Sequence, residues 1–127
     1  IGLVRSSLRS RGEAPRQGNE GAPDAWLELD ASVAAGLDGI GVDDELVLLT
    51  WFHQSRRDVL TVHPRGDVTL PLSGVFATRS PDRPNPIGLH RVRVLAIEGS
   101  SLHVSPLEAI DGTPIVDIKP VLAVRDD

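Results

Sequence analysis

The sequence predicts an all-β fold, either an antiparallel sandwich or a small closed barrel. Short segments that alternate apolar and polar residues recur along the chain, with little helical periodicity between them. The 12 glycines and 10 prolines fall mostly between these segments, as is typical of turns that join antiparallel strands. The 127 residues suffice to bury a core without disulfides, and we expect one domain spanning 1–127.

The first half of the chain contains three predicted strands and one short helix. After a polar, arginine-rich opening, residues 25–29 alternate as a strand. Residues 32–37 predict a short helix, with an Asp or Ser at its start and glycines at its end. Residues 44–52, DELVLLTWF, form a long apolar run that predicts a buried central strand, and residues 59–62 predict a further short strand.

Residues 89–97, LHRVRVLAI, predict an alternating strand. Its valines are expected to face the core, and either His90 or Arg91, together with Arg93, to face outward.

The last part of the chain predicts two hairpins. A turn at residues 99–101 leads into a strand at 102–107. Asp111-Gly112 is a frequent type I′ dipeptide, so we expect it to join 107–110 to 115–118 as an antiparallel pair.

Residues 74–89, GVFATRSPDRPNPIGL, form the most informative segment of the chain. Its three prolines fix φ and donate no hydrogen bond, which excludes a helix or an interior strand. We expect a stiff loop that presents Arg79, Arg83 and Asn85, with apolar residues at both ends, among them Phe76, anchored in the core. An ordinary solvated connection is the alternative.

The composition excludes several classes of protein. Without cysteine, the chain has no disulfide, thiolate nucleophile or cysteine-bound zinc. The nucleophile-elbow, P-loop, zinc-protease and dinucleotide-binding motifs are absent, and the four histidines show no metal-ligand spacing, so we expect no metal site. No apolar run approaches bilayer-spanning length and no signal-peptide pattern is seen, so a soluble cytoplasmic protein without a membrane partner is expected.

Charge and aromatic content leave the partner open. The net charge of -5 argues mildly against a broad grip on a polyphosphate, although clustered arginines permit a local basic face. Two Trp, two Phe and no Tyr are few platforms for stacking single-stranded RNA.

Four polar loops lie at expected strand ends, at residues 15–17, 53–54, 79–85 and 111–114. Each loop taken alone is also consistent with an ordinary turn. Together they offer guanidinium groups, a carboxylate, an imidazole and backbone amides, a set that suits a zwitterionic, adenine-bearing ligand.

These loops belong to four collinear motifs that resemble the TsaA/TrmO-like family: EAPRQG at 13–18, WFHQ at 51–54, the proline loop at 74–89, and DGTPIVDIKP at 111–120. The resemblance covers nearly the whole chain. It implies a small antiparallel β-barrel with one or two short helices in place of a Rossmann sheet. The implied activity is S-adenosylmethionine-dependent methyl transfer to N6 of threonylcarbamoyl-adenosine next to the anticodon in tRNA.

Carried over motif by motif, the resemblance implies a set of donor-binding positions. They are Pro15, Arg16, Gln17, His53, Gln54, Arg79, Leu89, Asp111, Gly112, Thr113 and Pro114. Arg79 or Arg16 is expected to pair with the carboxylate of the donor, and Asp111 to hold its amino group or ribose.

The residues that touch the acceptor are less defined. Arg83 and Asn85 are candidates for substrate binding, and Asn85 for orienting the acceptor. The candidates for a general base are His53, Asp82 and Asp111. In-line displacement at a sulfonium methyl depends mainly on holding the reacting atoms close together, and proton loss can follow methyl transfer.

The resemblance also implies a homodimer with the donor near the subunit interface. Asp82 and Val121 depart from the residue types that the family tends to carry there, and the sequence lacks the C-terminal extension of longer relatives. Two other functions therefore stay open: the same fold methylating a small molecule, and a donor-binding module without turnover.

Overall fold

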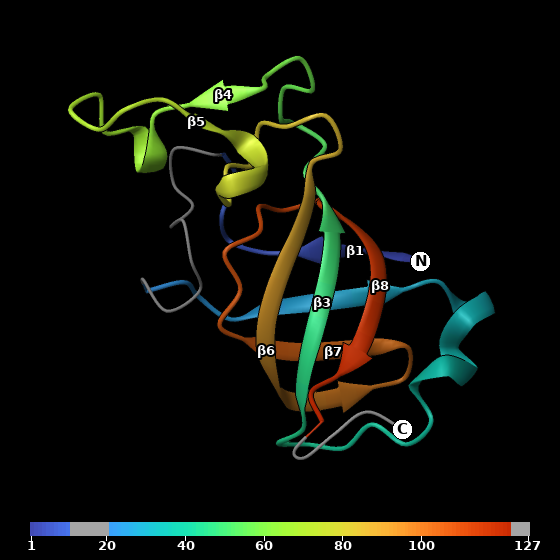
Figure 1. The fold of residues 1–127 in the computed structure, drawn as a ribbon. Helices are drawn as coiled ribbons and strands as arrows, with labels where there is room; N and C mark the ends of the chain where they lie inside the picture. The colour runs from blue at the N-terminus through green and yellow to red at the C-terminus, as the bar shows by residue number, and fades with distance from the viewer. Residues whose placement is uncertain (11–20, 123–127) are drawn as a thin grey trace.

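Six antiparallel strands close into a barrel in the order β1-β2-β7-β6-β3-β8 (Figure 1). The computed structural model describes residues 1–10 and 21–122. The barrel strands are β1 (Gly2–Arg5), β2 (Ala25–Leu29), β3 (Glu45–Trp51), β6 (Ile87–Glu98), β7 (Ser101–Ser105) and β8 (Pro114–Pro120). The predicted all-β barrel is confirmed, and its closure leaves the barrel itself without an open edge.

The barrel interior is filled by alternate residues of its strands. Leu27, Leu48 and Val94 are fully buried, as expected where one face of each strand points to the core. The predicted helix is a 3₁₀ helix, η2 (Ala31–Leu37), which packs Val33 against this core.

A second, two-stranded sheet lies over one end of the barrel (Figure 1). It pairs β4 (Thr61–Val62) with β5 (Ser73–Gly74), so the strand predicted at 59–62 is only two residues long. The short 3₁₀ helices η3 (Pro64–Gly66) and η4 (Val75–Ala77) accompany it. We call residues 60–77 the flap. No helix in 1–10 or 21–122 is long and apolar enough to cross a membrane.

The apolar ends of the proline loop are anchored only in part. Val75 is buried, but Phe76 is 80% exposed, and Ile87 and Leu89 lie about half exposed on the outer face of β6. The expectation that both ends sit in the core is therefore wrong. Strand alternation explains the exit, because Gly88 and His90 take the inward positions there.

The phase of β6 also decides which polar residues face outward. His90 is 2% exposed and points into the barrel, and Arg91 and Arg93 point out. Both arginines reach Glu45 on β3, and the hydrogen bond from Arg91 is the main cause that lowers the pKa of the Glu45 carboxyl.

The predicted hairpin at Asp111-Gly112 is wrong. β8 pairs with β3 and β1, whereas β7 pairs with β2 and β6. Among the two turn residues only Gly112 has positive φ, at 82°, whereas a type I′ turn requires positive φ at both. The turn is closed by the Thr113 amide on the Ile110 carbonyl at 3.2 Å, and it delivers the chain to β8 rather than back along β7.

Candidate functional site

The barrel topology brings three separate loops to one end of the molecule. Because β3 is antiparallel to β6 and β8, the end of β3 lies beside the start of both: Trp51 pairs with Ile87, and Thr50 with Ile115. The turn after β3, the proline loop before β6 and the segment before β8 therefore meet under the flap.

A cavity of about 1120 Å³ opens where these loops meet. Its walls come from the turn at 52–55, the flap, the proline loop at 77–82 and the segment at 108–113. Cavities that hold small molecules measure roughly 300–1,000 Å³, so this one is large enough for a nucleoside-sized ligand.

Arg83 holds the proline loop in shape. Its guanidinium donates to the backbone carbonyls of Thr78, Ser80 and Val75, at 3.1, 3.2 and 2.8 Å. Its amide donates to the Arg56 carbonyl at 3.0 Å. A planar fork with several donors suits such a cluster of carbonyls. Arg83 thus faces its own loop, although we expected it to be presented to a substrate.

The turn after β3 is bound to the same loop. Asp82 Oδ1 accepts from the Arg56 amide at 2.9 Å. Arg57 donates to Asn85 Oδ1 at 3.0 Å and to the Pro84 carbonyl at 2.7 Å. Asp82 lines the cavity and Asn85 does not. These contacts brace the two walls against each other.

Further charges support this brace. The Arg57 guanidinium lies 5.2 Å from the centre of the Trp51 ring, a cation–π arrangement. Arg56 donates to Asp58 at 3.0 and 2.9 Å, and this hydrogen bonding is the main cause that lowers the pKa of the Asp58 carboxyl.

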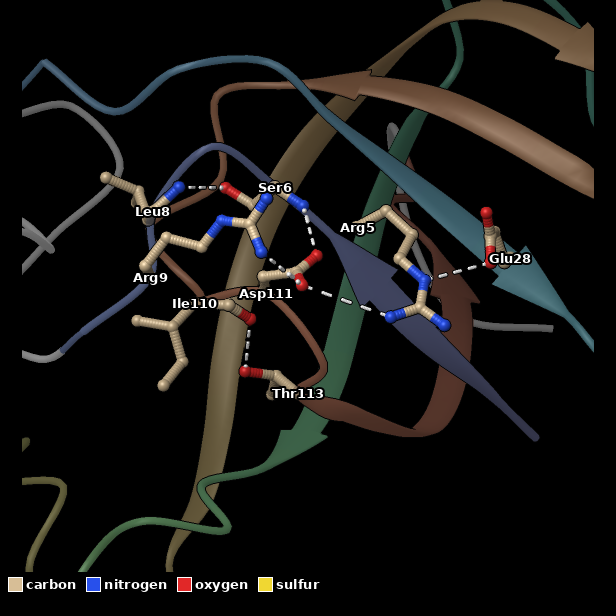
Figure 2. A network of polar contacts seen from close by, with 8 residues as sticks. All are labelled: Arg5, Ser6, Leu8, Arg9, Glu28, Ile110, Asp111 and Thr113. Carbon is tan, nitrogen blue, oxygen red and sulfur yellow. Dashed lines mark hydrogen bonds and ion pairs between the residues drawn. The ribbon is translucent and has the colours of Figure 1, made fainter.

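Asp111 is engaged with the N-terminal segment (Figure 2). Its Oδ1 accepts from the Ser6 amide at 3.0 Å, and its Oδ2 lies 3.4 Å from Arg9 Nη1 and 4.0 Å from Arg5 Nη1. The Gly112 amide donates to the Val4 carbonyl at 2.7 Å. The turn is therefore fixed to β1, and Asp111 lies behind the cavity wall rather than in it.

Of the predicted donor-binding residues, four line the cavity: His53, Gln54, Arg79 and Thr113. Thr113 is fully buried and donates to the Ile110 carbonyl at 2.7 Å. Within the described part of the chain, the Arg79 guanidinium makes no hydrogen bond or ion pair, so its donors remain for a ligand.

The other predicted positions lie elsewhere. Leu89 faces outward on β6 and is 49% exposed. Asp111, Gly112 and Pro114 belong to the turn beside the cavity but do not line it. The predictions at Pro15, Arg16 and Gln17 lie outside the described residues. Within 1–10 and 21–122, no three potential ligand side chains are grouped to hold a metal ion.

A buried network of polar side chains that no sequence motif indicated lies next to the cavity. His90 Nε2 lies 2.7 Å from Thr50 Oγ1, and its Nδ1 is hydrogen-bonded to Glu108, which lines the cavity. The strict alternation of HRVRV around two core valines carries a signal for His90, because it puts His90 on the inward face. Nothing in the sequence around Glu108 points to this contact.

The chain matches the family described as the tRNA-methyltransferase O N-terminal domain over residues 3–127. The chain belongs to this family. The resemblance proposed from the four motifs is thereby confirmed.

Curated relatives and solved structures agree with this assignment. A probable S-adenosyl-L-methionine-binding protein of Methanocaldococcus jannaschii is 48% identical over 73% of this chain and 77% of its own length. The probable S-adenosyl-L-methionine-binding protein VirR of Rhizobium radiobacter is 40% identical over 94% of this chain and 67% of its own length.

Two crystal structures named TrmO share the fold. One superposes with a TM-score of 0.76 at 36% identity, covering 96% of this chain and 55% of the solved chain. TrmO from Pseudomonas aeruginosa gives a TM-score of 0.75 at 34% identity, covering 96% of this chain and 53% of its own. This chain thus spans a little over half the length of those proteins.

The contacts of Arg83 predict a structural cost for its removal. Arg83→Ala should lower the free energy of unfolding by about 1.5–3 kcal/mol, because charge-assisted hydrogen bonds to three partly buried carbonyls are lost. Arg79→Ala, four positions earlier and exposed, should change it by less than about 0.5 kcal/mol. Chemical denaturation of both variants measures the difference, and equal costs would contradict the role given to Arg83.

Proposed function

We propose that this chain binds S-adenosylmethionine and transfers its methyl group to N6 of threonylcarbamoyl-adenosine next to the anticodon in tRNA, in the cytoplasm. The observation that carries the proposal is the cavity. It gathers His53, Gln54, Arg79 and Thr113 from three separate loops, in a chain whose family is named for a tRNA methyltransferase. The names of the curated relatives support the donor.

The residues of the cavity fit such a donor. Arg79 offers a guanidinium for its carboxylate, and Glu108, from the segment before β8, adds a second titratable side chain to the cavity lining. The bound donor supplies an activated methyl on a sulfonium with a neutral leaving group. The braced proline loop then has to hold the acceptor nitrogen within near-attack distance of that methyl, which is the main requirement of such a displacement.

A homodimer would account for two features that a single subunit leaves without a role. Leu89 was expected at the donor, yet it faces away from the cavity of its own subunit. Large apolar side chains on the flap are exposed, among them Leu60 (64%), Leu72 (60%) and Phe76 (80%). We infer that a second copy of this chain covers these residues, because exposed apolar groups of this kind mark interaction sites.

A donor-binding module without turnover is the second candidate function. The names of the curated relatives favour it, because they state binding of S-adenosyl-L-methionine and no transfer.

Labelled donor tests the proposed acceptor. The chain should deposit label on tRNA that carries threonylcarbamoyl-adenosine and not on the same tRNA transcribed without modifications, because the modified base is the proposed acceptor. Calorimetry with the donor and its demethylated product should show binding in both cases. Binding without label on either tRNA would favour the module without turnover, and no binding at all would refute both candidates.

Arg79→Ala should weaken donor binding by about 1.5–3 kcal/mol, the scale of a hydrogen bond to a charged group. Arg91→Ala is the matched control, because Arg91 lies on the outer face of β6 and pairs with Glu45. Calorimetry measures both affinities. An unchanged affinity in Arg79→Ala would remove Arg79 from the donor site.

Phe76→Ser should shift the chain from dimer toward monomer, because it removes the most exposed large apolar side chain of the flap. Val42→Ser, at a 56% exposed position outside the flap, should leave the association unchanged. Sedimentation velocity over a range of concentrations separates the two. A wild-type chain that stays monomeric at high concentration would contradict the proposed interface.

A further inference from the structure

A hydrogen-bonded network of three polar side chains, Thr50, His90 and Glu108, extends from the barrel core to the cavity. Thr50 Oγ1 and His90 Nε2 are 2.7 Å apart, and His90 Nδ1 is hydrogen-bonded to Glu108 Oε1. Thr50 is fully buried, the His90 side chain has no exposed surface, and the Glu108 side chain is 12% exposed. Glu108 lines the cavity, whereas Thr50 and His90 do not. A ligand in the cavity can therefore contact this network through the Glu108 side chain.

Gly88 and Phe52 pack closely around the Thr50–His90–Glu108 network. A Cβ on Gly88 would lie 2.5 Å from Thr50 Oγ1 and 2.7 Å from His90 Nε2, closer than such atoms approach in proteins. The Phe52 ring meets the imidazole edge-on, with centroids 5.8 Å apart. The imidazole is therefore held in one orientation, with its two nitrogens directed to their two partners.

The order of the groups differs from that of a nucleophilic triad. In a serine hydrolase the hydroxyl faces the substrate and the carboxylate is buried behind the histidine. Here the hydroxyl of Thr50 is the buried end and the carboxylate of Glu108 is the end at the cavity. The arrangement cannot present Thr50 as a nucleophile, but it can present Glu108 as a base.

The hydrogen bonds of the Thr50–His90–Glu108 network are all made whether Glu108 is ionised or protonated. With an ionised Glu108, Nδ1–H donates to the carboxylate and the Thr50 hydroxyl donates to Nε2. With a proton on Oε2 of Glu108, the carbonyl oxygen Oε1 still accepts from Nδ1–H and the Thr50 hydroxyl still donates to Nε2, so neither contact of His90 has to change. A proton can therefore enter at Glu108 without leaving a buried polar atom unpaired, the usual cost of charging or neutralising a buried group.

We propose that Glu108 accepts the proton that the acceptor nitrogen loses on methylation, with His90 and Thr50 as positioning residues. This inference rests on the proposed function, because it requires an acceptor with an N–H group. The nitrogen forms a bond to the methyl carbon, the carbon–sulfur bond breaks, and its electron pair stays on sulfur. The proton moves from the nitrogen to a Glu108 oxygen and leaves to solvent through the open cavity.

Glu108→Gln tests the proton acceptor directly. The amide keeps the size of the side chain and a hydrogen bond to His90, but it cannot take up the proton. The single-turnover rate of methyl transfer to modified tRNA, at saturating donor and tRNA, should fall about a hundredfold or more, with donor affinity within about threefold of wild type. Glu98→Gln is the matched control, because Glu98 is exposed at the far end of β6.

Thr50→Val and Thr50→Ser test the positioning role. Valine removes the hydroxyl at nearly constant volume and leaves Nε2 without its partner, so the transfer rate should fall about tenfold. Serine restores the hydroxyl and should recover most of that loss. Thermal unfolding of each variant shows whether the barrel remains folded, and a loss that is equal in Val and Ser would assign Thr50 to packing and overturn its positioning role.

The outcomes separate this inference from the proposed function. If wild type methylates tRNA and Glu108→Gln does so at the same rate, Glu108 is not the proton acceptor and the proposed function stands. If Glu108→Gln loses donor affinity in parallel with transfer, Glu108 is a donor-binding group and the inference is overturned. If wild type binds the donor but methylates no tRNA, the proposed acceptor and the inference fail together.

Discussion

The closure of the barrel is the constraint on which the cavity depends. β1 is only four residues long, yet it joins β2 to β8 and completes the cylinder. Gly2 permits this, because a Cβ there would lie 2.3 Å from the Glu28 carbonyl oxygen. With β8 held between β1 and β3, its leading segment reaches the end of the barrel where β3 leaves and β6 begins. In an open sheet, without the pairing of β1 with β8, these loops would not be brought together at one end.

The proline loop shows how similar residues take opposite roles in one segment. Arg83 turns back onto three carbonyls of its own loop, and Arg79, four positions earlier, lies in the cavity wall with no partner among the described residues. The prolines restrict the backbone torsion angles of the loop, and the hydrogen bonds of Arg83 and Arg57 restrain its backbone further. Arg83 thus stiffens the loop, while Arg79 is available to bind a ligand. A ligand therefore need not order the loop when it binds.

Two acidic residues close in sequence, Asp111 and Glu108, are placed differently at the cavity. Asp111 is committed to the N-terminal segment through Ser6, Arg5 and Arg9 (Figure 2). Glu108, three residues earlier, carries the carboxylate that reaches the cavity. The motif at 111–120 therefore fixes the turn beside the cavity, and Glu108, just outside that motif, supplies a carboxyl group to the lining.

The sequence by itself determined the fold class, the strands near 25–29, 44–52 and 89–97, the stiff proline loop and the family. These follow from local signals, since alternation, proline geometry and short motifs act over a few residues. Only the tertiary structure decided that β8 pairs with β3 and β1, that Arg83 faces its own loop, and that His90 meets Glu108. Each of these depends on residues far apart in the chain, and a strand pattern does not name the partner that lies beside it.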